Sequence, residues 1–326
     1  MTPLGRALEE RIRREGPITV EAYMEACNDY YYATRDPFGS SGDFTTSPEI
    51  HQMFGEIVGA ALGDIWVRAG KPANAVYAEL GPGRGTLAAD ALRVMRRVGF
   101  SGKAQLVETS PILRAAQEKL VPVAQFVSSI DQLPKVPLLL VANEFFDALP
   151  VRQFVEGLER RVILAAGGLA FDRDGAIVED SPARDEAARL VASHLAAYGG
   201  AAIIIDYGHA GGVTGDTLQA VRAHRYSYVL DHPGEQDLTA HVDFSALAKT
   251  AKAAGASVSR ITSQGSWLET LGIGARAMAL AAKNPADTQA IAEARRRLCD
   301  DEEMGRLFKL IALTGPGWPP VAGLDQ

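Results

Sequence analysis

The chain has 326 residues, of which 47% are hydrophobic, and it carries a formal net charge of −7 with a pI near 5.5. This length and composition predict a globular protein with a full hydrophobic core, either one large α/β domain with additions or two domains. The acidic balance argues against broad affinity for nucleic acids or anionic membranes.

The positions of the cysteines and the lengths of the apolar segments argue against several further classes of protein. Cys27 and Cys299 lie far apart, which argues against a disulfide framework or a cysteine-based zinc cluster. The first ten residues lack the apolar core of a signal peptide, and no apolar run approaches the ~20 residues that a membrane helix requires. We therefore expect a cytoplasmic protein without membrane insertion.

The N-terminal part of the chain is predicted to be mainly helical. Apolar residues recur at helical spacing in two stretches between residues 3 and 34, which predicts two helices. A loop rich in turn formers and hydroxyls follows at 35–46, and long ordered loops of this type are often functional. Ser47 is the predicted N-cap of a third helix, with Pro48 at its first position and a buried stripe reaching Ile65.

From residue 74 onward, strand and helix patterns alternate, which predicts a parallel sheet with helices on both faces. The predicted strands are 75–80, 104–108, 124–128, 137–142, 201–206 and 306–313, and the predicted helices are 86–98, 110–120, 183–198, 243–254 and 286–299.

Two irregular segments interrupt this pattern. Short β-type runs between turn residues occupy 151–180 and indicate an antiparallel insertion, and a second insertion covers 207–242. We therefore expect an N-terminal helical region over 1–70 and a doubly wound core over 71–326 that carries both insertions.

A glycine-rich turn joins the first core strand to its helix. Residues 76–85 read Val-Tyr-Ala-Glu-Leu-Gly-Pro-Gly-Arg-Gly, and glycine lets the backbone take positive φ and a ligand approach main-chain N–H groups. A dinucleotide fingerprint would require glycine at position 86, where the chain has Thr86. Glu79 would repel a pyrophosphate but suits the ammonium and sulfonium of S-adenosylmethionine (SAM). A SAM site is therefore favoured over an ordinary tight turn, with these glycines as cofactor contacts: Gly81, Gly83 and Gly85.

Polar residues also follow the next two strands, where ligands of doubly wound sheets bind. Glu108 ends the second strand and would accept hydrogen bonds from both ribose hydroxyls. Ile130 would flank an adenine after the third strand, and Asp131 would accept from its amino group. Solvated turn residues are the alternative for all three.

The fourth strand ends in Asn-Glu-Phe-Phe-Asp-Ala-Leu-Pro at 143–150. A guanidinium acceptor stays protonated in proteins, so carboxylates are needed to orient it for attack on a methyl group. Glu144 and Asp147 would serve, with Asn143 beside them. The alternative is an N-cap acid next to core phenylalanines.

Acids and histidines follow later in the chain. Asp206 and His209 come after the fifth strand and supply a carboxylate and an imidazole. His224, His232 and His241 lie 8 and 9 positions apart, spacings that match no known zinc pattern, so we expect no metal site.

Long stretches of the chain resemble the MidA family, the bacterial and mitochondrial relatives of complex I assembly factor 7. The stretches are Arg-Asp-Pro-Phe-Gly at 35–39, Gly-Asp-Phe-Thr-Thr-Ser-Pro-Glu-Ile at 42–50, Glu-Leu-Gly-Pro-Gly-Arg-Gly-Thr-Leu at 79–87, Ala-Asn-Glu-Phe-Phe-Asp-Ala-Leu-Pro at 142–150, Ile-Asp-Tyr-Gly at 205–208, Gly-Asp-Thr-Leu-Gln-Ala at 215–220 and Asp-Leu-Thr-Ala-His-Val-Asp-Phe at 237–244. The resemblance implies a class I SAM-dependent methyltransferase fold. It also implies a protein substrate, an arginine of a complex I core subunit.

The resemblance assigns roles to several residues. Glu79 and the three glycines match the family's SAM loop, Glu108 matches its ribose-binding acid, and Asn143 and Glu144 match the position after the fourth strand. Asp43 and Thr45 lie in a loop that is characteristic of the family, and we expect this loop to close over SAM or the acceptor.

Other functions stay open at this point. Amino-group DNA methyltransferases carry Asn/Asp-Pro-Pro-Tyr/Phe after this strand, whereas Asn143 is followed by Glu-Phe-Phe, which disfavours a nucleobase and favours a cation. A methyltransferase for small molecules and a non-catalytic assembly chaperone that keeps the SAM fold are the main alternatives. A Rossmann oxidoreductase is the weakest, because the third glycine is misplaced.

Overall fold

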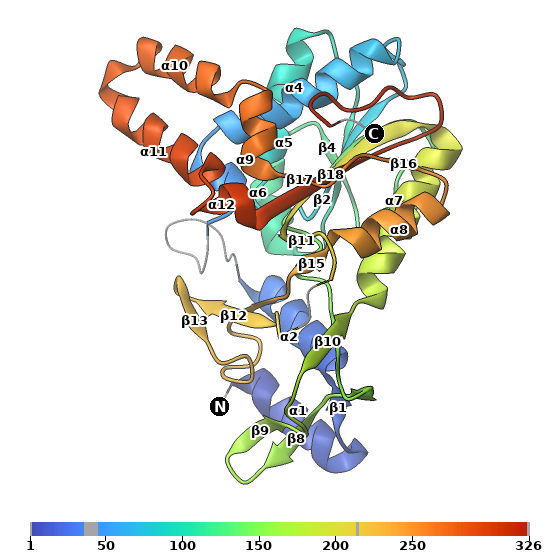
Figure 1. Ribbon diagram of the computed structural model, residues 1–326, viewed down its shortest axis with the longest axis vertical. Coiled ribbons are helices and arrows are strands. Elements are labelled where there is room, and N and C mark those ends of the chain that lie inside the picture. Colours follow the sequence, from blue (N-terminus) through green and yellow to red (C-terminus); the bar gives the residue numbers. More distant parts are fainter. Residues whose placement is uncertain (1, 36–44, 213–214, 325–326) are drawn as a thin grey trace. The chain divides into compact units, whose positions relative to one another are not determined.

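The computed structural model of the protein describes residues 2–35, 45–212 and 215–324 (Figure 1). The chain divides into two compact units, and each unit is assembled from three separate segments. The first unit contains Met1–Thr45, Phe146–Glu186 and Gly212–Val242, and the second, which we call the sheet unit, contains Thr46–Phe145, Ala187–Gly211 and Asp243–Gln326.

The sheet unit is built on one mainly parallel sheet with the order β16-β18-β11-β5-β2-β3-β4. Strands β4, β3, β2, β5 and β11 run parallel, and β18 is antiparallel to β11. The bounds are β2 Val76–Leu80, β3 Ala104–Val107, β4 Ala124–Val127, β5 Leu138–Asn143, β11 Gly200–His209, β15 Val242–Asp243, β16 Ser257–Val258, β17 Thr262–Ser263 and β18 Phe308–Thr314. The predicted doubly wound α/β fold is confirmed.

The strand order reverses between β2 and β5. From β2 the chain proceeds outward through β3 and β4, and from β5 it proceeds the other way through β11. Ligands of such sheets bind beyond the carboxyl ends of the strands at this reversal. The ends of β2 and β5 are therefore the places where functional residues are expected.

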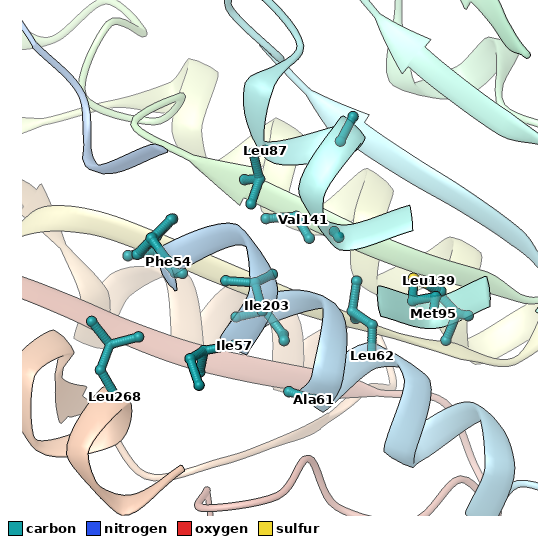
Figure 2. Packing of buried hydrophobic residues seen from close by; sticks show 14 of the residues in the cluster. Phe54, Ile57, Ala61, Leu62, Leu87, Met95, Leu139, Val141, Ile203 and Leu268 are labelled. Carbon is teal, nitrogen blue, oxygen red and sulfur yellow. The ribbon is translucent and has the colours of Figure 1, made fainter. Parts of the chain in front are cut away.

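Helices cover the sheet and supply most of its core. Phe54, Ile57 and Leu62 of α4 lie close to Val141 and Ile203 of the sheet in Figure 2, all of them within one buried cluster. The helices are α3 Ser47–Ile50, α4 Met53–Arg68, α5 Thr86–Arg97, α6 Pro111–Leu120, α7 Pro182–Tyr198, α8 Phe244–Ala253, α9 Gln264–Thr270, α10 Ile273–Lys283, α11 Thr288–Cys299 and α12 Met304–Leu307, with short 3-10 turns at Ile130–Gln132 and Pro285–Asp287.

The segment predicted as one helix from Ser47 to Ile65 is two helices, so that prediction was wrong. Thr46, not Ser47, occupies the N-cap position of α3. His51 then takes an extended conformation, and its Nδ1 accepts the backbone N–H of Met53, the first residue of α4, at 3.2 Å. The extended backbone at His51 therefore interrupts the helix. The sequence analysis also missed α9 and α10.

The first unit joins segments that the sequence suggested were independent. Its helices are α1 Pro3–Glu15 and α2 Val20–Thr34, and its strands are β1 Ile18–Thr19, β6 Arg152–Val155, β7 Leu158–Glu159, β8 Arg161–Ala165, β9 Gly168–Phe171, β10 Ile177–Asp180, β12 Gln219–Arg222, β13 Arg225–Ser227 and β14 Asp237–Thr239. Strands β6 to β10 pair antiparallel, as their sequence pattern predicts.

One hydrophobic core holds these three segments together. Leu8 and Met24 come from the N-terminal helices, Val162 from the 151–180 segment, and Leu218 and Leu238 from the 207–242 segment, and all belong to the same buried cluster. Residues 46–68 pack instead with the sheet unit, whereas the sequence analysis placed them in the N-terminal region. Among the helices of residues 2–35, 45–212 and 215–324, none combines the length and apolar character that crossing a bilayer requires.

The close contact between α4 and α5 predicts a stability difference between two glycines of α4. A Cβ on Gly59 would lie 2.5 Å from Cα of Ala91 in α5, whereas a Cβ on Gly63 would lie 3.2 Å from the movable Cγ2 of Val98. We expect Gly59→Ala to lower the free energy of unfolding by about 1–3 kcal/mol through overpacking. Gly63→Ala gains the same helix propensity without the backbone clash and should be near neutral.

Urea unfolding followed by far-ultraviolet circular dichroism measures both variants. Equal midpoints for Gly59→Ala and Gly63→Ala would show that the close approach of α4 to α5 does not limit the packing of the sheet unit.

Candidate active site at the carboxyl edge of the sheet

The glycine turn after β2 has the backbone that its sequence predicts. Gly81, Gly83 and Gly85 have φ of 59°, 54° and 88°, values that disfavour residues with a side chain. A Cβ on Gly81 would lie 3.0 Å from Cδ2 of Phe145, and one on Gly85 would lie 3.3 Å from Cγ of Gln117. The turn is therefore held between the residues that follow β5 and helix α6, and a side chain at either position would be tightly packed as well as conformationally strained.

Glu79 lies in β2 directly below this turn. Its side chain is buried, and the hydroxyl of Tyr77 donates a hydrogen bond to its Oε2. Burial raises the pKa of Glu79 to about 8. A cation at this edge of the sheet would favour the ionised carboxylate, so the residue fits the positively charged end of SAM.

Glu108 is held rigidly just beyond β3. Its Oε1 accepts the backbone N–H groups of Thr109 and Ser110 at 2.9 and 2.8 Å, and its Oε2 accepts Nε2 of Gln117 at 3.1 Å. Burial raises the pKa of Glu108, while these hydrogen bonds act in the opposite direction. The carboxylate is thus in a fixed orientation, as a ribose-binding acid requires.

Asn143 and Glu144 stand at the carboxyl end of β5. Oε1 of Glu144 accepts Nδ2 of Asn143 at 3.0 Å and the backbone N–H of Ser47 at 2.9 Å. Glu144 has φ 51°, a left-handed conformation that costs on the order of 1 kcal/mol or more for a residue with a side chain. Asn143 Oδ1 is buried and meets no hydrogen-bond donor within the described part of the chain. Backbone strain and a buried acceptor mark this strand end as a functional site candidate.

The structure extends the fifth strand beyond Asp206. The sequence predicted a strand over 201–206 and placed His209 after it, but β11 continues to His209. Asp206 and Tyr207 pair with Lys309 and Phe308 of β18, and β15 also pairs with β11. Asp206 is fully buried, and its Oδ1 accepts the backbone N–H of Tyr207 at 3.0 Å. It lies just beyond the end of β5, because the preceding residue of β11 pairs with the last residue of β5.

The remaining predicted residues are distributed over both units. Ile130 is buried in the 3-10 turn after β4, and Asp131 is exposed. Thr45 and Asp147 belong to the first unit, and Asp43 lies outside the described residues. The sheet unit therefore contains the other predicted site residues: Glu79, the three glycines, Glu108, Ile130, Asp131, Asn143, Glu144 and Asp206.

Sequence reasoning missed side chains that support this site. Gln117 donates from Nε2 to the main-chain carbonyl of Gly83 at 2.6 Å, and Thr86 Oγ1 donates to Glu49 Oε1 at 2.5 Å. Gln117 follows Leu113 by one helical turn on the buried face of α6, and a glutamine on an apolar stripe is the signal that would have identified it.

The histidines do not assemble a metal site in the part of the chain that the structure covers. His209 Nδ1 accepts the backbone N–H of Gly211 at 3.2 Å, and His224, His232 and His241 lie in the first unit. No group of three or more His, Cys, Asp or Glu residues in the described ranges has the geometry to hold a metal ion.

Comparison with known proteins shows which family the chain belongs to. The family model described as "Putative S-adenosyl-L-methionine-dependent methyltransferase" matches residues 57–166 and 160–262. The chain belongs to this methyltransferase family. The matched region includes the glycine turn, Glu108 and the end of β5.

Relatives extend the similarity over nearly the whole chain. A Bos taurus protein named "Protein arginine methyltransferase NDUFAF7, mitochondrial" is 34% identical, over 96% of this chain and 83% of that protein. The Homo sapiens protein of the same name is 33% identical, over 96% and 83%. A crystal structure of a COG1565 superfamily member from Burkholderia thailandensis, bound to S-adenosyl-homocysteine, has a TM-score of 0.82 and 26% identity and covers 99% of this chain and 92% of that chain.

This methyltransferase uses SAM, as the glycine spacing and Glu79 predict, and the resemblance to complex I assembly factor 7 is confirmed. Family membership removes the oxidoreductase alternative. The side chains at this edge of the sheet also suit the cofactor, because buried carboxylates lie on either side of a turn whose glycines leave main-chain groups accessible to a ligand.

The buried position of Glu79 predicts a pH-dependent stability. Its pKa is raised from 4.5 to about 8, so the folded state holds a proton that the unfolded chain has lost. The stabilisation is complete below pH 4.5 and is lost as the pH rises through about 8. We expect the free energy of unfolding of the wild type to fall across this window relative to Glu79→Gln.

Urea unfolding of both proteins between about pH 5 and pH 8 measures this difference. Tyr77→Phe removes a hydrogen bond that lowers the pKa of Glu79, so its stability should fall further than that of the wild type over the same range. If the free energy of unfolding changed with pH in the same way for the wild type and Glu79→Gln, the raised pKa of Glu79 would be contradicted.

Proposed function

We propose that this methyltransferase transfers the methyl group of SAM to an arginine of a protein substrate. The observation that carries the proposal is Glu144, a carboxylate held in a left-handed backbone conformation at the end of β5, beside a buried amide oxygen of Asn143. The relatives named as protein arginine methyltransferases support the same acceptor.

The chemistry of arginine explains why an acid is needed there. A guanidinium remains protonated in proteins and spreads its charge over three nitrogens, so its nucleophilicity is low. A carboxylate that binds two of its N–H groups would concentrate the positive charge away from the third nitrogen. Glu144 would bind the guanidinium in this way, and Asn143 Oδ1 would accept a further N–H group.

The cofactor side of the site would use the residues around the glycine turn. Glu79 and the main-chain groups of Gly81, Gly83 and Gly85 would bind the methionine part, Glu108 the ribose, and Ile130 and Asp131 the adenine. SAM supplies the methyl group, and alignment of the acceptor nitrogen with it at ~3 to 3.5 Å contributes roughly 7–11 kcal/mol to catalysis.

Four further residues complete the proposal: Asp206 lies in the sheet unit, Asp147 and Thr45 belong to the first unit, and Asp43 lies outside the described residues. Asp147 and Asp206 are additional carboxylates for the guanidinium, and Asp43 and Thr45 belong to the loop that we expect to close over the bound molecules. A complex I core subunit is the proposed substrate, because the sequence resembles assembly factors of that complex.

The substrate class is tested by incubating the protein with methyl-labelled SAM and candidate complex I subunits, followed by mass spectrometry of the labelled peptide. Label on arginine supports the proposal, and label on another residue type assigns a different acceptor. SAM binding without transfer to any subunit favours the assembly chaperone, and transfer only to low-molecular-weight compounds favours a small-molecule methyltransferase.

Replacement of the acceptor carboxylate should separate chemistry from cofactor binding. Glu144→Gln keeps an oxygen that can accept the N–H of Ser47 but removes the charge. We expect turnover to fall on the order of 100-fold, the effect typical of losing one positioned charged group, while SAM affinity stays within about twofold. Initial rates and calorimetric titration measure the two quantities, with Glu118→Gln on the exposed face of α6 as control.

Replacement of a turn glycine, unlike replacement of Glu144, should remove cofactor binding itself. Gly83 has φ 54°, which valine strongly disfavours, so Gly83→Val should abolish measurable SAM binding in calorimetry. Gly99 follows α5, also has a positive φ of 96°, and has open space around its Cβ position. Gly99→Val imposes similar strain elsewhere in the sheet unit and should retain SAM binding. If both variants lost SAM binding, general destabilisation would explain the loss in Gly83→Val.

A further inference from the structure

Gln117 connects the two halves of the cofactor site. It lies in α6 (Figure 1), its side chain is fully buried, and its Nε2 donates to the main-chain carbonyl of Gly83 at 2.6 Å and to Oε2 of Glu108 at 3.1 Å. Gly83 belongs to the turn proposed to bind the methionine part of SAM, and Glu108 is the acid proposed to bind the ribose. One amide group therefore links the two elements.

The orientation of this amide is determined by its partners. A main-chain carbonyl oxygen and a carboxylate oxygen both accept hydrogen bonds, so the NH₂ group of Gln117, which has two hydrogens, must face them. The reversed amide would place Oε1 against both acceptors. The observed orientation is the one that makes two hydrogen bonds.

The other end of the amide shows which of its groups the site requires. Oε1 of Gln117 is buried and meets no hydrogen-bond donor among the residues that the structure describes. A buried carbonyl without a donor is costly, and an apolar side chain of similar size would avoid that cost. The position therefore has a glutamine for its NH₂ group, not for packing alone.

Helix α6 itself is fixed to the same residues. Arg114, one turn before Gln117, donates from Nε to the main-chain carbonyl of Glu108 at 2.8 Å, and Ser110 caps the start of the helix. At the other side, the Cα and Cγ atoms of Gln117 lie 3.5 and 3.3 Å from the Cβ position of Gly85. The helix is thereby positioned against both Glu108 and the glycine turn.

We propose that Gln117 is a positioning residue that sets the distance between the glycine turn and Glu108, so that the methionine part and the ribose of SAM bind without rearrangement of the site. The inference rests on the proposed function, because it requires SAM to contact both elements. A site that is already in its bound geometry loses less conformational freedom on binding and has higher affinity. Without the link, the turn and the carboxylate would each have to be ordered by the ligand.

The first test compares Gln117→Met with the wild type in calorimetric titrations of S-adenosylhomocysteine and in methyl-transfer kinetics. Methionine fills a similar volume and has no donor. We expect the affinity for S-adenosylhomocysteine to fall by about tenfold or more, and KM for SAM to rise by a similar factor that exceeds any fall in kcat. The KM for the protein substrate should stay unchanged.

A double-mutant cycle with Glu108→Gln separates positioning from a general structural role. If Gln117 acts through the carboxylate, Gln117→Met should weaken S-adenosylhomocysteine binding far less in the Glu108→Gln background than in the wild type. Equal fold-changes in both backgrounds, or unchanged affinity of Gln117→Met, would overturn the inference.

Gln105 provides a matched control. It is a buried glutamine of β3 whose Nε2 donates to Oε1 of Gln125 at 2.8 Å, and its own Oε1 also meets no donor within the described ranges. Gln105→Met should leave the affinity for S-adenosylhomocysteine unchanged, since this amide contacts neither the glycine turn nor Glu108. Equal losses in Gln105→Met and Gln117→Met would overturn the inference in favour of general core damage.

Thermal unfolding of each variant without ligand checks that it folds, and Gln117→Leu is the second variant if the methionine substitution does not. A wild-type protein that fails to bind S-adenosylhomocysteine would refute the proposed cofactor site and the inference together. A wild-type protein that binds it, with Gln117 variants that bind equally well, would refute the inference alone.

Discussion

The left-handed backbone of the glycine turn after β2 is the constraint on which the site depends. A parallel strand that enters a helix within a few residues must reverse direction sharply, and the positive φ values of Gly81, Gly83 and Gly85 accomplish this. Because the turn is also packed between Phe145 and Gln117, a side chain at Gly81 or Gly85 would press against one of these two residues. The same glycines that permit the turn thus allow the cofactor residues of neighbouring strands to approach one another.

Buried carboxylates give the site its chemical character. Glu79 and Glu108 both have raised pKa values because burial disfavours their charged forms, and each is held by hydrogen bonds. A protein interior tolerates such groups when a ligand supplies the compensating charge or hydrogen bonds. In the proposed site, SAM would provide a cation for Glu79 and hydroxyl donors for Glu108, whereas a pyrophosphate would provide neither.

The secondary structure of the sheet unit was largely predictable, whereas several long-range features were not. Strands β2, β3, β4 and β5 were predicted to within a residue or two because apolar runs bounded by turn residues give a strong local signal. The end of β11 was not, because its extension depends on pairing with β18 and β15, which lie far along the chain. The break at His51 comes from its extended backbone conformation, and no periodicity reveals it.

The sequence by itself determined the fold class, the cofactor and the residues at the strand ends, since each follows from local patterns: alternating strands and helices, glycine spacing and an acid two residues before the first glycine. Only the tertiary structure decided which distant segments share a core. Residues 1–45, 146–186 and 212–242 form one unit because their apolar faces bury one another, and such contacts leave no local trace. It also decided that Gln117 bridges the glycine turn and Glu108, because a hydrogen bond depends on position in space and not on spacing along the chain.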